Sequence, residues 1–129
     1  MDITTNLYLP YLQLLTKDLF FMSESDYPWE VVYLGKDEAE MKRLLPFDLQ
    51  AAKQVELTQL LKNALKTQDW YGEEELAIVK KYQYLLDTLQ TELQTVYAYK
   101  FGEIEIAVYV LVHLPNNEWI ALKTISVET

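Results

Sequence analysis

The fold expected for this chain depends on one stretch, which reads Glu103-Ile104-Glu105-Ile106-Ala107-Val108-Tyr109-Val110-Leu111-Val112-His113-Leu114. Its even positions are all aliphatic, which is the period-two pattern of a β-strand with one face in the core. Its odd positions are polar at the ends and apolar in the middle, so the second face is expected to be partly covered as well. A sheet that is apolar on both faces needs helices on both faces. The stretch therefore predicts a three-layer α/β/α sandwich.

Further strands are expected on both sides of this stretch and once near the N-terminus. Residues 96–101 precede it, and residues 119–127 follow it after a turn at residues 115–117. Such short connections favour antiparallel pairing. Residues 29–34 are rich in β-branched and aromatic side chains and give a fourth strand, which we expect to make the sheet mixed. The predicted fold class is α/β (α+β), with a mixed, mostly antiparallel four-stranded sheet.

Three helices are predicted from apolar residues that recur at spacings of three and four. The first spans residues 7–21, with Pro10 in its first turn, where a missing N–H is tolerated. The second is a short amphipathic helix over residues 57–65. The third and clearest spans residues 73–93, with Asp69 as its N-cap and three glutamates in its first turn.

Residues 20–30 read Phe-Phe-Met-Ser-Glu-Ser-Asp-Tyr-Pro-Trp-Glu and join the first predicted helix to the first strand. Polar side chains occupy positions 23–26 between aromatic flanks, which predicts an anchored loop with its polar tip in water. Ser23 and Asp26 resemble a helix-start capping pair, but Pro28 pushes the residue before it into an extended conformation. From these residues alone a solvated turn is the favoured interpretation, and an acidic binding loop is the alternative.

The composition indicates one domain, residues 1–129, whose charge permits a basic partner. Half of the 129 residues are hydrophobic, and the absence of cysteine excludes disulfides and thiolate metal sites. The net charge of −9 disfavours binding to nucleic acid or anionic membranes and would speed encounter with a basic partner. Solubility alone is the commoner explanation of such a charge. No apolar run approaches the ~18 residues of a membrane span. The N-terminus lacks the features of a signal peptide, so we expect a cytoplasmic protein.

Few residues could support catalysis. His113 is the only histidine, and three glycines are too few for the usual phosphate-cradling loop. Glu103 and Glu105 lie one pleat repeat apart on the predicted strand, and with His113 they could bind a cation or perform acid–base chemistry. A solvated strand end is the favoured interpretation. The residues therefore indicate an acidic domain that is not an enzyme, needs no cofactor and holds no metal of its own.

Four blocks of the sequence resemble the signature of the cyanobacterial nuclease A inhibitor family, in the family's order and at its approximate spacing. They are Phe20–Val31, Gln68–Tyr71 with the acidic run that follows, Tyr99–Glu105 continuing into Val108–Val110, and Ile125–Thr129. Residues 36–54 do not match the family's segment in length or composition. We interpret them as a long, partly structured connection.

The resemblance implies an α/β/α sandwich that inhibits a sugar-non-specific, magnesium-dependent nuclease of the ββα-metal type. By position it implies that Glu24 pairs with an arginine at the nuclease active site and that Trp70 packs against the nuclease surface. It also implies that Thr129 places its hydroxyl and terminal carboxylate near the catalytic metal through water. A nuclease cleft is basic because it binds phosphate, and a carboxylate can replace phosphate in a charge-assisted pair with arginine. The alternative is an acidic interaction module of the same fold with a different basic partner.

Overall fold

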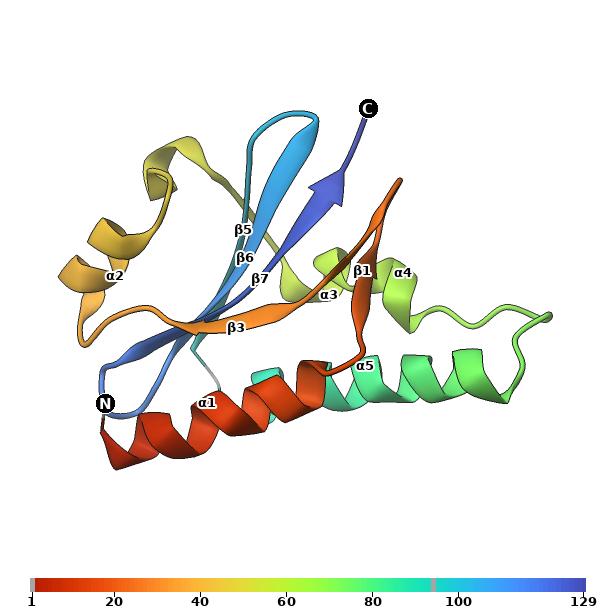
Figure 1. Cartoon of the computed structure of the whole chain (residues 1–129), viewed down its shortest axis with the longest axis horizontal. Coiled ribbons are helices and arrows are strands. Elements are labelled where there is room, and N and C mark those ends of the chain that lie inside the picture. The colour runs from red at the N-terminus through yellow and green to blue at the C-terminus, as the bar shows by residue number, and fades with distance from the viewer. Residues whose placement is uncertain (1, 94) are drawn as a thin grey trace.

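The computed structural model describes residues 2–93 and 95–129 and is built around a five-stranded sheet (Figure 1). The sheet order is β3-β7-β6-β5-β4, and all neighbouring strands are antiparallel. In this order the strands are Glu30–Tyr33, Trp119–Val127, Glu105–His113, Val96–Phe101 and Lys53–Val55. The predicted α+β class is confirmed, whereas the mixed sheet and the count of four strands are wrong. Since β3 and β4 lie at opposite edges, the segment between them crosses the sheet and forms no parallel βαβ unit.

The fifth strand, β4, lies in the segment that the sequence suggested was a connection. It has three residues, pairs with residues 98–100 of β5 and exposes two of its side chains. Polar residues at a sheet edge carry little strand propensity, which is why the pattern did not reveal β4. The helix α2 (Glu38–Leu44) and the single 3-10 turn η1 (Leu49–Ala51) precede it. Residues 36–54 therefore hold three regular elements.

One face of the sheet is covered by the two long helices, α1 (Ile3–Thr16) and α5 (Glu73–Thr91), and by two single-turn helices, α3 (Leu57–Leu60) and α4 (Lys62–Leu65). The even positions of β6 enter this core, as the alternation predicted. The main buried side chains there are Leu12, Leu19, Trp29, Leu61, Tyr82, Leu85, Leu89, Val108, Val110, Val112, Ile120 and Leu122. Ile104 is an exception, because it lies in the turn before β6 and is exposed.

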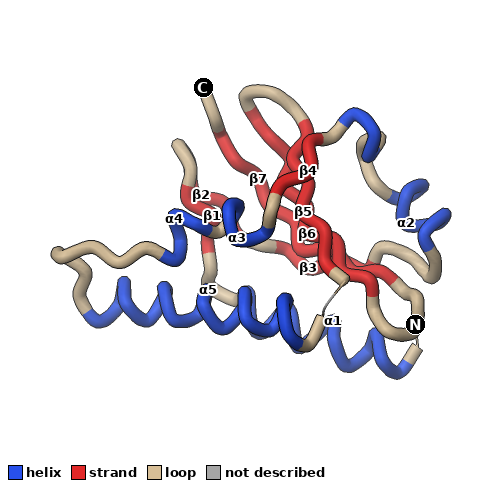
Figure 2. Tube along the Cα trace, turned by 180° about the vertical axis from the view of Figure 1, so that it is seen from behind, coloured by secondary structure: helices blue, strands red, loops and turns tan. Residues whose placement is uncertain are grey.

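Among the described residues, α2 and the segment around η1 cover the second face of the sheet, and Figure 2 shows α2 on that face. The odd positions of β6 and β7 pack there against Leu34, Met41, Leu45 and Phe47. The predicted cover on both faces is therefore present, but the two layers are unequal. One consists of two long helices, and the other of a seven-residue helix with a 3-10 turn.

The N-terminal helix differs from its prediction at both ends. It begins at Ile3 and ends at Thr16, so Pro10 lies inside it and not in its first turn. Asp18 adopts a positive φ of 63°, which reverses the chain after the helix. Residues 20–28 then form a β-hairpin. The prediction that the helix extends to residue 21 is therefore wrong, and so is the prediction that residues 20–30 form a loop without regular structure.

The other helix predictions hold with small corrections. Residues 57–65 form two short helices, because the chain breaks its regular conformation at Leu61. The N-cap of α5 is Gly72 and not Asp69, and the backbone N–H of Gly72 donates to the Glu75 carboxylate at 3.5 Å. The side chain of Glu75, the third residue of α5, therefore caps the start of the helix.

Candidate partner-binding site

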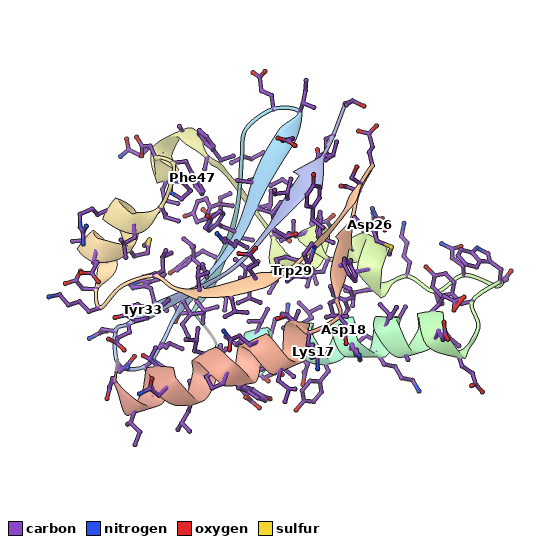
Figure 3. The ribbon with its side chains drawn as sticks, viewed as in Figure 1. Lys17, Asp18, Asp26, Trp29, Tyr33 and Phe47 are labelled. Carbon is purple, nitrogen blue, oxygen red and sulfur yellow. The ribbon has the colours of Figure 1, made fainter. Side chains whose placement is uncertain are left out.

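The hairpin β1 (Phe20–Met22) and β2 (Asp26–Pro28) lies beside the second half of β7. Pro28 ends the hairpin, and the hydroxyl of Thr124 on β7 donates to the Pro28 carbonyl at 2.9 Å. A proline fits this end position because it has no backbone N–H to pair. Figure 3 shows Asp18 where the chain leaves α1 and Asp26 farther along the hairpin. The hairpin and β3 therefore lie one after the other along the same edge of β7.

The tip of the hairpin, residues 23–25, is bound to the last residues of β7. The Glu24 N–H donates to the Val127 carbonyl at 3.3 Å, and the Val127 N–H donates to Ser23 Oγ at 2.9 Å. Ser23 Oγ in turn donates to the Ser25 carbonyl at 2.8 Å. Ser23 is therefore a turn residue that joins two chain segments, and it is not a helix cap.

Glu24 and Thr129, which the sequence analysis named separately, are in direct contact. The Thr129 N–H donates to Glu24 Oε2 at 2.6 Å, and Thr129 Oγ1 lies 2.7 Å from Oε1 and 2.9 Å from Oε2. Both residues are exposed. A carboxylate offers about four acceptor positions, so these two donors leave room for an incoming bidentate cation. The contact holds a negatively charged group in one orientation at the surface.

The end of the chain is supported from its other side by the turn between β5 and β6. The Glu128 N–H donates to the Ile104 carbonyl at 2.9 Å, and Lys100 Nζ lies 2.8 Å from Glu128 Oε2. Ser126 Oγ donates to the same carboxylate oxygen at 2.8 Å. The hydrogen bond from the Lys100 ammonium holds the pKa of Glu128 below its ordinary value. Residues 127–129 are therefore held between two turns, as their place in Figure 1 shows.

The base of the hairpin is fixed by a buried hydrogen-bond chain. Trp29 Nε1 donates to the Tyr82 hydroxyl at 3.0 Å, and that hydroxyl donates to the Phe20 carbonyl. Phe21 packs edge-on against Trp29, with ring centroids 5.7 Å apart. Burial raises the pKa of Tyr82 to about 12, so the phenol stays protonated and can donate. These contacts tie β1 to α5.

Trp70 lies in the loop before α5 and is 73 % exposed. Its ring packs edge-on against Tyr71, with centroids 4.6 Å apart. Together with Phe20, Met22 and Ile78, Trp70 lines a groove of about 260 Å³. Phe20 and Met22 are each about half exposed and were missed as surface residues, because the helix predicted to residue 21 obscured their alternation. The hairpin therefore presents its charged tip to solvent and an apolar flank toward Trp70.

The alternative set of Glu103, Glu105 and His113 is not brought together. Glu103 lies in the turn before β6, and Glu105 and His113 are the two ends of that strand. Eight steps along a strand separate those ends by roughly 26 Å. The His113 ring stacks on Trp119 with centroids 4.4 Å apart. Within residues 2–93 and 95–129, no group of three histidine or acidic side chains could hold a metal ion.

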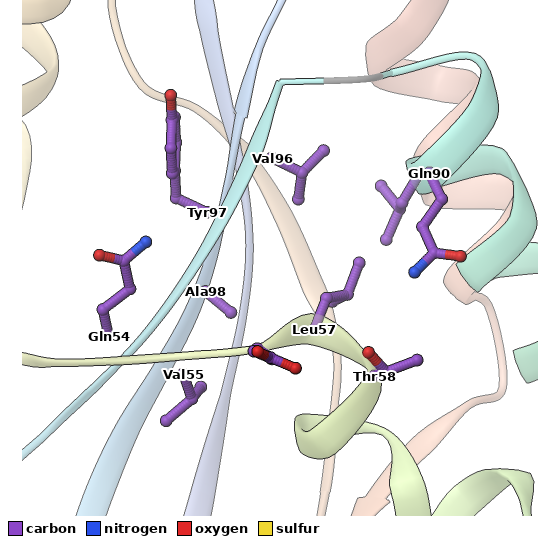
Figure 4. Close-up of a pocket in the computed structure, with 10 residues that line it drawn as sticks. Gln54, Val55, Leu57, Thr58, Gln90, Val96, Tyr97 and Ala98 are labelled. Carbon is purple, nitrogen blue, oxygen red and sulfur yellow. The ribbon is translucent and has the colours of Figure 1, made fainter.

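Two further observations concern surfaces away from the hairpin. An open pocket of about 780 Å³ lies between β5, α3 and the end of α5 (Figure 4). Among the described residues that line it, the ionisable side chains are Glu56 and Tyr97. In the described part of the chain, no helix has the length and apolar character to cross a membrane.

Comparison with known proteins places this geometry in context. The family model described as nuclease A inhibitor-like protein matches residues 7–129. The matched range includes residues 36–54, the segment that did not resemble the family. No curated protein matches the sequence.

Proposed function

Because the chain belongs to the nuclease A inhibitor-like family, we propose that it inhibits a sugar-non-specific, magnesium-dependent nuclease of the ββα-metal type by occupying its active site. The hairpin tip, the C-terminal residues and Trp70 together form the inhibitory surface. Direct binding of nucleic acid plays no part, and the protein acts in the cytoplasm without a cofactor.

The observation that carries this proposal is the contact between Glu24 and Thr129. Two residues that the family resemblance assigns to the inhibitory site lie within hydrogen-bond distance, although 105 positions separate them. The Glu24 carboxylate is already oriented by the Thr129 N–H and retains free acceptor positions. An arginine that normally binds a scissile phosphate can therefore pair with this carboxylate without first ordering it.

Thr129 has the second role in the proposed mechanism. Its hydroxyl oxygen keeps lone pairs while donating to Glu24, so it can also accept a hydrogen bond from a water on the partner's metal ion. In a chain that ends at this residue, the terminal carboxylate adds a second negative charge beside the first. A basic, metal-containing cleft attracts both groups, and the net charge of −9 accelerates the encounter.

Trp70 supplies the apolar part of the surface. Its indole is largely exposed and borders the groove lined by Phe20 and Met22. Exposed tryptophans of this kind are frequent hot spots, since they bury a large area at small entropic cost. We assign to it the packing contact that orients the charged tip in the cleft.

Nuclease inhibition by the purified protein tests the proposal. Inhibition of a ββα-metal nuclease from the same organism should be stoichiometric, for both DNA and RNA substrates. Glu24→Gln should raise the inhibition constant about 100-fold, because it removes one partner of a desolvated charge pair. Glu38→Gln is the matched control, since it removes the same charge at the start of α2 on the other face of the sheet.

Two outcomes would contradict the proposal. One is unchanged degradation of both substrates at micromolar excess of the protein over each nuclease of the organism. The other is equal inhibition by the Glu24→Gln and Glu38→Gln variants, which would place the contact elsewhere. Recovery of a basic protein that is not a nuclease in a pull-down would favour the alternative, an acidic interaction module of the same fold.

A further inference from the structure

The helix α1 is apolar on two opposite sides. Leu12 is fully buried on its inner side. Ile3, Leu7, Pro10 and Leu14 are exposed, and at 100° per residue they fall within a narrow stripe opposite Leu12. Successive residues of the stripe are four, three and four positions apart, and this spacing is typical of a helix that packs against another helix.

This outer stripe is unusual for a surface of this protein. Residues 3–16 contain no charged side chain, although 24 % of the whole chain is charged. Ile3, Leu7 and Leu14 are 73 %, 67 % and 68 % exposed. A surface helix normally has one apolar face toward the core and a charged or polar face toward solvent, and the outer stripe departs from this pattern. Single exposed leucines are ordinary on a surface, but a continuous stripe indicates a contact surface.

We propose that the outer stripe of α1 packs antiparallel against the same stripe of a second copy of this chain. A two-fold axis between residues 8 and 9 places Ile3 opposite Leu14 of the other copy and Leu7 opposite Pro10. The stripe is therefore self-complementary, as a two-fold interface requires. Antiparallel packing also brings the positive end of each helix dipole near the negative end of the other.

Charge favours a second copy over other occupants. Two copies that each carry −9 repel one another over most of their surface, and an uncharged helix is where they can approach at least electrostatic cost. An anionic membrane would repel the protein as well. A basic partner would gain no charge contact from a helix without acidic residues. The absence of charge therefore selects an uncharged, apolar counterpart, and α1 itself has that chemistry.

The size of the stripe sets the expected affinity. Covering three aliphatic side chains that are each about two-thirds exposed removes on the order of 400 Å² per copy, about half of a standard interface. We therefore expect a reversible dimer with a Kd of about 10–100 µM. Tyr84 on α5 is half exposed, and its hydroxyl lies 3.3 Å from that of Tyr11, so it extends the apolar edge of the stripe.

The dimer leaves the candidate inhibitory site free. In both views, α1 lies at the lower end of the molecule and the C-terminus at the upper end (Figures 1 and 2). Each copy can then engage its own partner, so the dimer presents two inhibitory surfaces that point away from the interface. The inference does not depend on the proposed function, because it rests on α1 alone.

Sedimentation equilibrium of the untagged chain between about 1 µM and 1 mM tests the dimer. The mass should rise with concentration from 15.2 kDa toward twice that value. Leu7→Glu and Leu14→Glu should each weaken self-association at least tenfold, since they place like charges at the interface. Gln13→Glu adds the same charge on an exposed position beside the stripe, and it should retain most of the dimer. Circular dichroism should show the native helix content in all three variants.

Cross-linking tests the antiparallel arrangement, and the chain has no cysteine to interfere. An equimolar mixture of Ile3→Cys and Leu14→Cys should form a mixed disulfide dimer on mild oxidation. Leu14→Cys alone should not, because an antiparallel pair separates its two copies by roughly 16 Å along the helix axis.

Three results would overturn the proposal. The first is a monomer at every concentration, and the second is equal association of the Leu7→Glu and Gln13→Glu variants. The third is binding of the monomer to neutral phosphatidylcholine vesicles through the same leucines, which would make the stripe a lipid-facing surface. Nuclease inhibition measured on Leu7→Glu separates the two ideas, because it should be unchanged whether or not the dimer forms.

Discussion

The hairpin tip and the loop that carries Trp70 differ in how the protein holds them. The tip is bound by hydrogen bonds from Val127 and Thr129, so its carboxylate is fixed before any partner arrives. In the described part of the chain, the Trp70 loop is held by the bond from the Tyr71 N–H to the Gln68 carbonyl, by the Gly72 N–H bond to the Glu75 carboxylate and by the edge-on Tyr71 ring. A charge gains most from being fixed in advance, whereas an apolar ring can adapt its position as it becomes buried. In the proposed site, the tip therefore supplies orientation and the Trp70 loop supplies packing.

The largest effect is expected from disturbing the fixed half of the site. Extending the chain beyond Thr129 with a short flexible tag should raise the inhibition constant by about 100-fold or more, equivalent to ~2.7 kcal/mol. The tag displaces the residue that orients Glu24 and, under the proposed mechanism, adds bulk between Thr129 and the partner's metal. The same tag before the N-terminus is the control, because the two termini lie at opposite ends of the molecule (Figure 1). Full potency of the C-terminally tagged protein would show that Thr129 does not approach the metal.

A smaller loss of inhibition is expected in the adaptable half. Trp70→Ala should raise the inhibition constant about 30-fold, near the 2 kcal/mol typical of a hot spot. Its exposed side chain makes little contribution to folding, so the melting temperature should stay within about 2 °C. Trp29→Ala is the contrasting variant, because Trp29 is buried against Tyr82 and its loss should cost about 3–5 kcal/mol of stability. Equal melting shifts in the two variants would contradict this division.

The support beneath the hairpin can be weakened without touching its surface. Tyr82→Phe leaves Trp29 Nε1 and the Phe20 carbonyl without their partner, which should lower the free energy of unfolding by about 1–3 kcal/mol. Urea unfolding measures this loss, and hydrogen exchange at residues 20–28 should accelerate. Tyr84→Phe is the matched control, since Tyr84 is about half exposed and its hydroxyl lies 3.3 Å from that of Tyr11, away from the hairpin. If hydrogen exchange at residues 20–28 were unchanged in Tyr82→Phe, the contacts at the hairpin tip alone would be enough to hold the hairpin in place.

The smallest effect concerns acid. The pKa of Glu128 is lowered in the folded protein, chiefly by the hydrogen bond from Lys100. A depressed carboxyl pKa contributes stability above the unfolded value of 4.5, and this contribution is lost as the pH falls through the folded value. Because the pair is partly exposed, the contribution is below about 1 kcal/mol. Glu128→Gln should flatten the fall in stability below pH 4.5, as thermal melts across that range would show. An identical pH profile in the variant would rule out this contribution.

The regular parts of the sheet could be predicted from sequence, and its irregular edge could not. The strands 96–101 and 119–127 were placed at their observed ends, because β-branched and aromatic residues are frequent there and Gly102 and the turn at 115–117 mark boundaries. The hairpin was missed because Leu19, Phe20 and Phe21 continue a helical apolar pattern, while the reversal depends on the left-handed conformation of Asp18. A positive φ at a residue other than glycine leaves no clear sequence signal.

The candidate site shows the same limit. The contact between Glu24 and Thr129 joins distant positions, and no local pattern links them. Only the resemblance to a family assigned both residues to one site. Phe20 and Met22 were identified as exposed groove residues by the structure, after the helix boundary had been corrected.

The bond between the hairpin tip and the end of the chain also fixes when the site can exist. Glu24 and Thr129 are 105 residues apart, so at typical synthesis rates the ribosome needs about 5–20 s to pass from one to the other. Throughout that time the emerging hairpin has no β7 beside it and no partner for its carboxylate. A chain of this sequence therefore presents the assembled tip only after residue 129 has been made. Truncated products of translation, which lack the last few residues, contain most of the core but not the charged group in its fixed orientation.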